Sequence, residues 1–188
     1  MKISFIRNLA GRELDLEKYK HVIGVEALVW DVAPRYGINR EAACLAAVAH
    51  DLAKSLPFQE QIRLVQEEGL VEYEEDILMP QVLHGRLAAV RIRRQFGIED
   101  QDILNAVTYH TTGRPGMSPL ELLIYTADCV EPERNYLGVD KLRQKLYYSL
   151  KEAAIACMDA TIDRLESKGS PLHPLTCSAR ASLVCCES

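Results

Sequence analysis

Residues 46–54 hold the side chains of the chain that could most readily do chemistry. A strongly apolar, alanine-rich segment ends here in the pair His50-Asp51, and Lys54 follows three residues after the aspartate. Burying a charged or metal-binding pair costs free energy unless another group pairs with it. Two interpretations are open. Either His50 caps a helix end and Asp51 lies in water, or both belong to a metal site whose other ligands lie elsewhere in the chain.

Three more histidines and a second aspartate occur in similar surroundings. Each histidine lies on or beside an apolar helical face, on a different expected helix, and both aspartates lie near the C-terminal ends of apolar helices. A lone histidine of this kind is usually a core residue, but a helical bundle can direct side chains from several helices to one interior point. The candidate ligands are His21, His50, Asp51, His84, His110 and Asp128.

This set has the chemistry of a transition-metal site. Imidazole together with carboxylate suits Fe, Mn or Zn, whereas an all-oxygen set would suit Mg or Ca. No cysteine belongs to the set, which argues against a closed structural zinc site. Six ligands exceed what one tetrahedral metal requires, so the pattern predicts two metals with Asp51 as the bridge. Such a centre generates hydroxide near neutral pH and binds phosphate oxygens, and acid should weaken it by protonating the histidines.

The elements that must position these residues are all predicted to be helices. Asp15, Asn39 and Asp100 are candidate N-caps, and Ser118 with Glu121 has the spacing of a capping box. Apolar residues recur at helical spacing, and no stretch alternates with period two as a strand would. The expected fold is all-α, with helices at about 15–37, 40–54, 58–68, 80–97, 100–110, 118–128, 139–168 and 176–184.

The rest of the chain suggests no second site. The first dozen residues show no clear pattern, and the acidic run 67–76 is expected to be a solvated connection. The six cysteines form no CxxC pair and no finger-like spacing with histidine. The adjacent Cys185 and Cys186 are expected to be free thiols.

Length and composition are those of an ordinary globular protein. The 188 residues suffice for one domain with a sizeable core, and 48% of them are hydrophobic and 26% charged. The formal net charge of −5 argues against nucleic-acid binding, which needs a basic face. We expect no leader before residue 20, and no apolar run approaches the ~18 residues of a membrane span. We therefore expect a cytoplasmic protein with no membrane partner.

The order of the candidate ligands resembles a known superfamily. The succession His21…His50-Asp51…Asp128 is similar to that of the HD-domain metal-dependent phosphohydrolases, which are helical, and His84 with His110 resembles their binuclear branch. Three segments resemble the bacterial YqeK family more specifically: 83–85 (LHG), 109–118 (YHTTGRPGMS) and 127–134 (ADCVEPER). That family is described as symmetrical diadenosine tetraphosphatases, which cleave their substrate into two ADP. The resemblance runs from about residue 18 to about 183.

The resemblance implies roles for the matching residues. It implies a single HD-type domain, a helical bundle with a core at about 18–135 and C-terminal helices at 138–185. It makes all six candidates metal ligands, for two metal ions that would be iron first, with Mn or Zn as alternatives. Asp51 and Lys54 become the catalytic residues. The substrate-binding residues would be Lys54, Thr111, Thr112, Gly113, Arg114 and Arg134.

The expected reaction is attack of a metal-activated hydroxide on a central phosphorus, with ADP as the leaving group and product. Lys54 and Arg114 would take up developing charge, although a solvated helix-end lysine and a surface arginine are their alternatives. Three other functions stay open: a phosphohydrolase of mononucleotides, a catalytically silent nucleotide-binding sensor and a helical scaffold without a site. The metal, the preferred nucleotide and the oligomeric state, with a homodimer as one option, also stay open.

Overall fold

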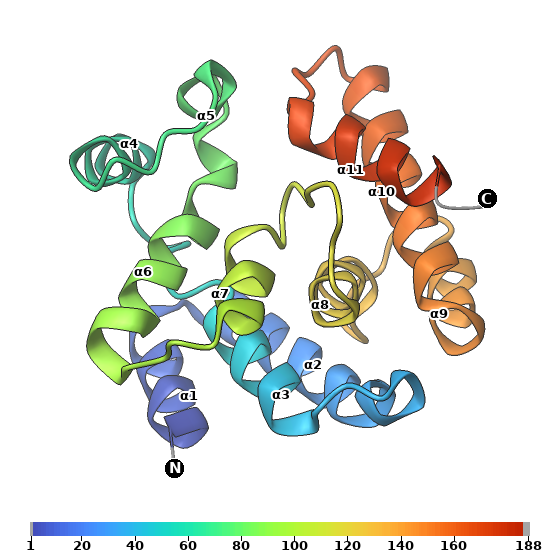
Figure 1. Ribbon diagram of the computed structural model, residues 1–188, viewed down its shortest axis with the longest axis horizontal. Coiled ribbons are helices and arrows are strands. Elements are labelled where there is room, and N and C mark those ends of the chain that lie inside the picture. The colour runs from blue at the N-terminus through green and yellow to red at the C-terminus, as the bar shows by residue number, and fades with distance from the viewer. Residues whose placement is uncertain (1, 186–188) are drawn as a thin grey trace.

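The computed structural model describes residues 2–185, and every regular element in that range is a helix, as predicted (Figure 1). Helix α8 lies between two groups of helices, with α4–α6 on one side and α9–α11 on the other. The elements are α1 (Lys2–Glu13), α2 (Leu16–Val32), the 3-10 helix η1 (Ala33–Tyr36), α3 (Arg40–Ala49), α4 (Phe58–Glu67), α5 (Glu74–Leu78), the 3-10 helix η2 (Pro80–Val82), α6 (His84–Phe96), α7 (Gln101–Thr108), α8 (Pro119–Val130), α9 (Val139–Tyr148), α10 (Leu150–Ser167) and α11 (Pro174–Cys185).

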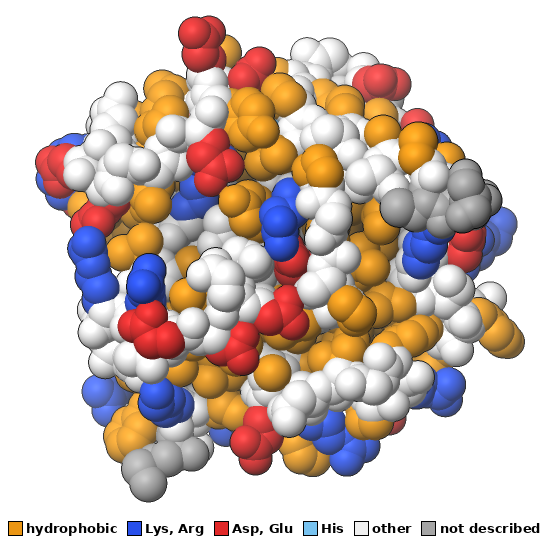
Figure 2. All heavy atoms as spheres, in the orientation of Figure 1, with side chains coloured by type: hydrophobic (Ala, Val, Ile, Leu, Met, Phe, Trp, Pro, Cys, Tyr) orange, Lys and Arg blue, Asp and Glu red, His pale blue; other side chains and the backbone are white. Residues whose placement is uncertain are grey.

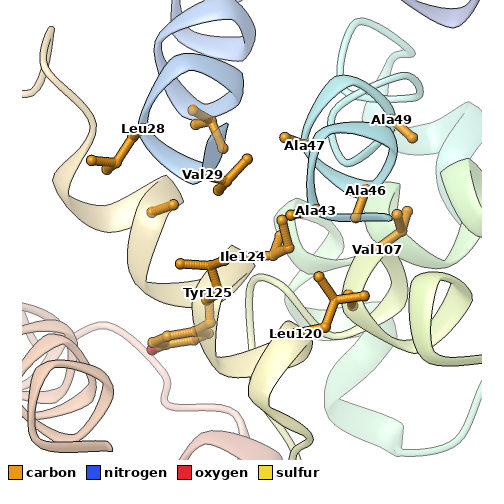
Figure 3. Close-up of a cluster of buried hydrophobic side chains, with 14 of the residues drawn as sticks. Leu28, Val29, Ala43, Ala46, Ala47, Ala49, Val107, Leu120, Ile124 and Tyr125 are labelled. Atoms are coloured by element: carbon orange, nitrogen blue, oxygen red, sulfur yellow. The ribbon is translucent and has the colours of Figure 1, made fainter. Parts of the chain in front are cut away.

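The main core lies where α2, α3, α7 and α8 meet. Helix α3 contacts α1, α2, α7 and α8, and its alanines Ala43, Ala46 and Ala47 are fully buried (Figure 3). Small side chains let the neighbouring backbones approach closely, and larger ones such as Ile124 and Val29 fill the space between them. Each fully buried aliphatic side chain of this kind contributes roughly 1.5–3 kcal/mol. The core therefore holds the helices that carry the candidate ligands in fixed positions.

The predicted helix starts are confirmed by their capping contacts. The Asp15 carboxylate accepts from the Lys18 backbone N–H, and the Asn39 side chain accepts from the Ala42 N–H. Asp100 caps α7 in the same way, and the Ser118 hydroxyl and the Glu121 carboxylate form both halves of a capping box on α8. These side chains satisfy the first N–H groups of each helix, which have no partner inside it.

The expected helix over 40–54 ends early. Helix α3 stops at Ala49, and the chain continues in tight turns in which the N–H groups of Leu52, Lys54 and Leu56 each donate to the carbonyl three residues earlier. Adjacent residues of an α-helix point about 100° apart. The turns remove that constraint, and His50 and Asp51 are both fully buried.

Three other differences from the sequence prediction follow from packing. The expected helix over 139–168 is interrupted at Ser149, whose extended backbone and hydroxyl cap the start of α10. The first dozen residues form α1, with Ile6 and Ala10 fully buried. The acidic run is not wholly solvated, because Asp76 in α5 is fully buried.

None of the described helices combines the length and apolarity needed to cross a membrane.

Candidate metal centre

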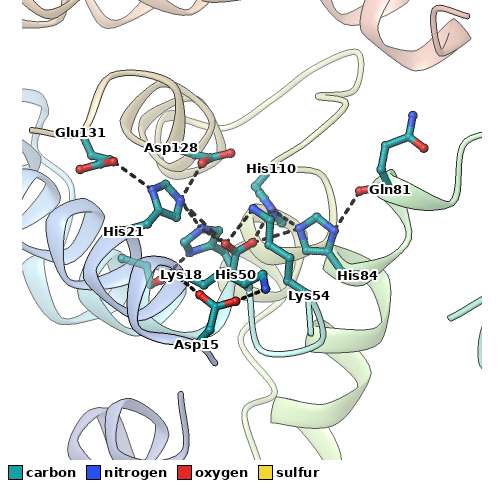
Figure 4. A network of polar contacts seen from close by, with 12 residues as sticks. Asp15, Lys18, His21, His50, Lys54, Gln81, His84, His110, Asp128 and Glu131 are labelled. Carbon is teal, nitrogen blue, oxygen red and sulfur yellow. Dashed lines mark hydrogen bonds and ion pairs between the residues drawn. The ribbon is translucent and has the colours of Figure 1, made fainter. Parts of the chain in front are cut away.

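The six predicted ligands lie in or just after five helices and meet at one interior point, and Figure 4 labels all of them except Asp51. His21 lies in α2, His84 begins α6 and Asp128 lies near the end of α8. His50 and Asp51 directly follow α3, and His110 follows α7. The four histidines and Asp51 are buried. Only Asp128 is partly exposed, through 18% of its side chain.

Asp51 stands between two pairs of histidines. Its Oδ1 lies 3.0 Å from His84 Nε2 and 3.6 Å from His110 Nε2. Its Oδ2 lies 3.4 Å from His50 Nε2 and 3.8 Å from His21 Nε2. One carboxylate oxygen therefore faces each pair, which is the arrangement that a bridging ligand requires. Two ligand groups result, His21 with His50 and Asp51, and Asp51 with His84 and His110.

The outer ring nitrogen of every histidine is occupied. His50, His84 and His110 direct Nδ1 at the backbone carbonyl three residues earlier, at 2.6, 3.0 and 2.8 Å. His21 directs Nδ1 at Glu131 Oε1, at 3.1 Å. Because these partners are acceptors, each Nδ1 carries a proton and each Nε2 points inward, as in metal-bound histidines.

The interior of the cluster fits a positive ion. The Nε2 atoms of His84 and His110 lie 3.0 Å apart, and those of His21 and His50 lie 3.3 Å apart. Two ring nitrogens this close repel each other unless a proton or a metal ion lies between them. Asp51 Oδ1 is buried and accepts no hydrogen bond within the described part of the chain, and such groups normally have a partner. The donor set therefore matches transition metals.

Asp128 completes the half of the cluster that contains His21. Its Oδ1 lies 2.9 Å from His21 Nε2 and also accepts from Arg134 Nη2 at 2.8 Å. This half thus has two carboxylates, Asp51 and Asp128, whereas the half with His84 has only the shared Asp51. The two halves differ in charge, although each offers two imidazoles.

Both carboxylates are held in their anionic form. Burial alone would raise the pKa of Asp51, but His50, His110 and His84 outweigh it and hold that pKa well below its usual range. Burial acts on Asp128 in the same way, and His21 and Lys54 lower its pKa further than burial raises it. Burial would lower the pKa of His21, but Asp128 and Glu131 raise it to about 9. A metal must therefore displace a proton from His21 at neutral pH.

Lys54 lies at the edge of the cluster. Its Nζ donates to Asp51 Oδ2 at 2.9 Å, and a third of its side chain is exposed. Burial would lower the pKa of Lys54, but the Asp51 and Asp128 carboxylates raise it above its ordinary value. Lys54 is therefore a cation that touches both the ligand set and the open space beside it.

That open space is a cavity of 680 Å³, within the range of small-molecule sites. The face shown in Figure 2 is hollowed near its centre, and hydrophobic side chains gather along the hollow. Among the predicted substrate-binding residues, Lys54, Thr111, Thr112 and Arg134 line the cavity. The ligands His84, His110 and Asp128 also reach its wall.

Gly113 and Arg114 are not part of the cavity lining. Arg114 forms two hydrogen bonds with the Glu121 carboxylate, at 2.6 and 2.7 Å, and its guanidinium lies over the Tyr109 ring. Glu121 is buried at the start of α8 and requires a cation. Gly113 packs against Met158. Arg114 therefore braces the loop rather than facing the ligand cluster.

Three charged or histidine side chains of the site and its cavity were not predicted from the sequence. Glu131 holds His21, and a signal for it existed, because it lies one helical turn after Asp128. Arg164 of α10 and His173, just before α11, line the cavity from the C-terminal part of the chain. Nothing in their local sequence relates them to ligands more than 30 residues away.

Comparison with known proteins identifies the family. The sequence model of the HD domain matches residues 19–133, more than half of the chain and a span that includes all six candidate ligands. The chain belongs to the HD-domain family. The HD-domain fold and the metal site of His21, His50, Asp51, His84 and His110 thus agree with the resemblance seen in the sequence.

Curated relatives of this HD-domain protein share a name. The chain is 38% identical over 178 residues, 94% of each chain, to "Bis(5'-nucleosyl)-tetraphosphatase, symmetrical" of Halalkalibacterium halodurans. It is 36% identical over 165 residues, 88% of each chain, to the Bacillus subtilis protein of the same name. A crystal structure from Clostridium acetobutylicum, described as an HD superfamily hydrolase involved in NAD metabolism, superposes with a TM-score of 0.93. That chain is 38% identical, and the match covers 97% of this chain and 96% of the other.

Proposed function

We propose that this HD-domain protein hydrolyses dinucleoside tetraphosphates symmetrically, converting diadenosine tetraphosphate and water into two ADP. One observation carries the proposal. A cluster built to bridge two metals opens on a cavity that is large enough for a nucleotide and is lined by three cationic side chains, Lys54, Arg134 and Arg164. The names of the relatives in Halalkalibacterium and Bacillus support the same reaction.

The metals we propose are two ions of iron, with manganese or zinc as alternatives, held by the four histidines, Asp51 and Asp128. Bound there, they would act as Lewis acids on phosphate oxygens and lower the pKa of a water molecule to near neutrality. Asp51 would face both ions through its two oxygens. Asp128 would complete the half that contains His21.

The chain's own cations have separate tasks in this proposal. In the reaction, a bond forms between the water oxygen and one central phosphorus, and the bond breaks between that phosphorus and the oxygen that bridges it to the other central phosphorus. One ADP carries the new oxygen and the other leaves with the bridging oxygen. Lys54, beside Asp51, would donate to a phosphate oxygen and stabilise the developing negative charge. Arg134, beside Asp128, would bind a neighbouring phosphate as a fork-shaped donor.

Other predictions from the sequence stay predictions. These are the division into an HD core at about 18–135 and C-terminal helices at 138–185, the cytoplasmic location, and the homodimer. Thr111 and Thr112 keep their proposed contacts to phosphate because both line the cavity. Cys186 lies outside the described residues, and Cys185 is exposed with a free thiol.

Metal content and product analysis together test the proposal. The purified protein should contain transition metal and convert diadenosine tetraphosphate to ADP alone, and Asp51→Ala should lose both the metal and the activity. ATP plus AMP as products would mean asymmetrical cleavage and would refute the proposed reaction. Assays with ATP and GTP decide between this function and the mononucleotide alternative, and NAD is tested beside them. NAD is included because of the description of the Clostridium relative.

A further inference from the structure

Part of the cavity wall lies outside the HD-domain match. That match ends at residue 133, whereas α10, α11 and the loop before α9 supply the wall opposite the ligand cluster. We call five of these residues the C-terminal wall: Leu137, Thr161, Arg164, Leu165 and Thr176. The metal ligands are shared with a large family of phosphohydrolases. Discrimination between substrates therefore has to come from residues such as these.

Arg164 is the cation of the C-terminal wall. It differs from the other two cations in the cavity because its side chain is not paired with a carboxylate in the described part of the chain. Lys54 donates to Asp51 and Arg134 donates to Asp128. The guanidinium of Arg164 forms no hydrogen bond or ion pair with any of the residues 2–185. It lies on the cavity wall with all five of its donors available. A planar, permanently charged fork of this kind matches phosphate oxygens.

The proposed substrate has two nucleotide halves, and the second half needs a binding surface of its own. Cleavage at the centre of a dinucleoside tetraphosphate leaves two phosphates and a nucleoside on each side of the reacting phosphorus. A site near Lys54 and Arg134 can hold one half, but the other half extends away from the ligand cluster. It needs its own positive charge for phosphate and an apolar surface for a nucleobase. The C-terminal wall offers both, through Arg164 and through Leu137 and Leu165.

The C-terminal wall is fixed in place across the cavity. Helix α10 packs along α8, which carries Asp128. At the start of α11, His173 Nε2 donates to Asp76 Oδ1 at 3.0 Å, and both side chains are buried. This contact joins the C-terminal helices to α5 on the other side of the cavity. A wall held at both ends can act as a preformed site and does not need to be ordered by the ligand.

We propose that the C-terminal wall binds the second nucleotide half of a dinucleoside polyphosphate, with Arg164 pairing with its phosphate. This inference rests on the proposed function, because it assigns the far half of that function's substrate. It makes Arg164 a specificity-determining residue that selects substrates with two nucleotide halves over mononucleotides. It assigns Leu137 and Leu165 to the nucleobase, and Thr161 and Thr176 to hydroxyl contacts with sugar or phosphate.

Steady-state kinetics of Arg164→Gln on diadenosine tetraphosphate test the inference. The KM should rise about 10-fold, the effect of one charge-assisted hydrogen bond, and kcat should change less than about 3-fold because the ligand cluster is untouched. Arg164→Lys should recover part of the loss. Lys168→Gln is the matched control, because it removes the same charge from an exposed residue that directly follows α10, four residues after Arg164, and lies outside the cavity. Its KM should equal that of the wild type.

The outcomes separate this inference from the proposed function. If wild type forms ADP but Arg164→Gln keeps the wild-type KM, the C-terminal wall does not bind the second half. If Lys168→Gln weakens binding as much, the effect is one of overall charge and the inference also fails. If wild type does not hydrolyse diadenosine tetraphosphate, the proposed function fails. Calorimetric binding of the same intact compound to wild type and Arg164→Gln then decides the inference, which predicts weaker binding by the variant.

Discussion

Two buried clusters in this protein pair a carboxylate with histidine, and they differ in one respect. Asp76 accepts at Oδ2 from the N–H groups of Glu72 and Tyr73, at 2.8 and 2.9 Å, and from Arg86 at 2.6 Å. Its Oδ1 faces His173 Nε2. Nδ1 of the same histidine accepts from the Leu175 N–H, at 3.2 Å. Both carboxylate oxygens of Asp76 and both ring nitrogens of His173 therefore have partners, which leaves no free ligand atom on either side chain.

The cluster around Asp51 is satisfied on its outside and open on its inside. Backbone carbonyls and Glu131 occupy the outer nitrogens of the histidines, but Asp51 Oδ1 accepts no hydrogen bond from residues 2–185 and the Nε2 atoms face one another. Residue types alone do not separate the two clusters. The difference is whether buried acceptor atoms remain without a hydrogen-bond donor, so that a cation is needed to satisfy them.

The largest expected effect is the loss of metal from Asp51→Asn. The amide keeps the shape but removes the shared negative charge that both halves of the cluster use. Outer partners of metal ligands already contribute 10- to 100-fold to affinity, so metal affinity should fall by more than about 100-fold. Metal analysis after dialysis measures it. An Asp51→Asn protein with wild-type metal content would show that the cluster is as closed as the one around Asp76.

Asp76→Ala should lower stability and leave metal binding unchanged, the opposite of what is expected for Asp51→Asn. It leaves Arg86 buried without its partner and breaks the contact to His173, and removing one partner of a buried pair costs about 3–5 kcal/mol. We expect the free energy of unfolding to fall by about that amount while metal content stays at the wild-type level. Denaturant unfolding and metal analysis of the same preparation check both. Loss of metal without loss of stability would contradict the structural role of this cluster.

Glu131→Gln tests His21, which differs from the other three histidines of the metal centre because a carboxylate, not a backbone carbonyl, holds its Nδ1. The amide oxygen still accepts from His21 Nδ1 but no longer supports the imidazole with a negative charge. Metal affinity should fall about 10- to 100-fold, as measured by competition with a chromophoric chelator. Glu133→Gln, at an exposed neighbour, is the control. Gly24→Ala should weaken binding too, because its Cβ would lie 2.4 Å from Glu131 Oε2.

The smallest expected effect is on the pH dependence of stability in the metal-free protein. Burial would raise the pKa of Asp76, but the N–H groups of Tyr73 and Glu72, with Arg86, lower it below its ordinary value of 3.8. A carboxylate with a lowered pKa stabilises the fold above pH 3.8, and this contribution is lost as the pH falls through the lowered value. The stability gap between wild type and Asp76→Asn should therefore be constant from pH 7 to about 5 and narrow below 3.8. A gap that widens in acid would contradict this.

The sequence by itself determined the helical fold, most helix starts and the six residues that meet at the candidate metal centre. Caps and apolar periodicity act within a few residues, and a histidine on an apolar helical face is visible without knowledge of its neighbours. The exact end of α3 and the break at Ser149 were not predictable, because the α-helical pattern continues through both and packing decides where it stops.

Only the tertiary structure decided which charged residues are occupied and which are available. The sequence suggests a phosphate contact for Arg114, but the fold pairs it with Glu121. The sequence predicts a solvated Asp76, but the fold buries it against His173, 97 residues away. Arg164 carried no local signal, yet it lies on the cavity wall without a partner among the described residues. A charge acts on whatever the fold places within a few ångströms of it, and that neighbour is usually distant in the chain.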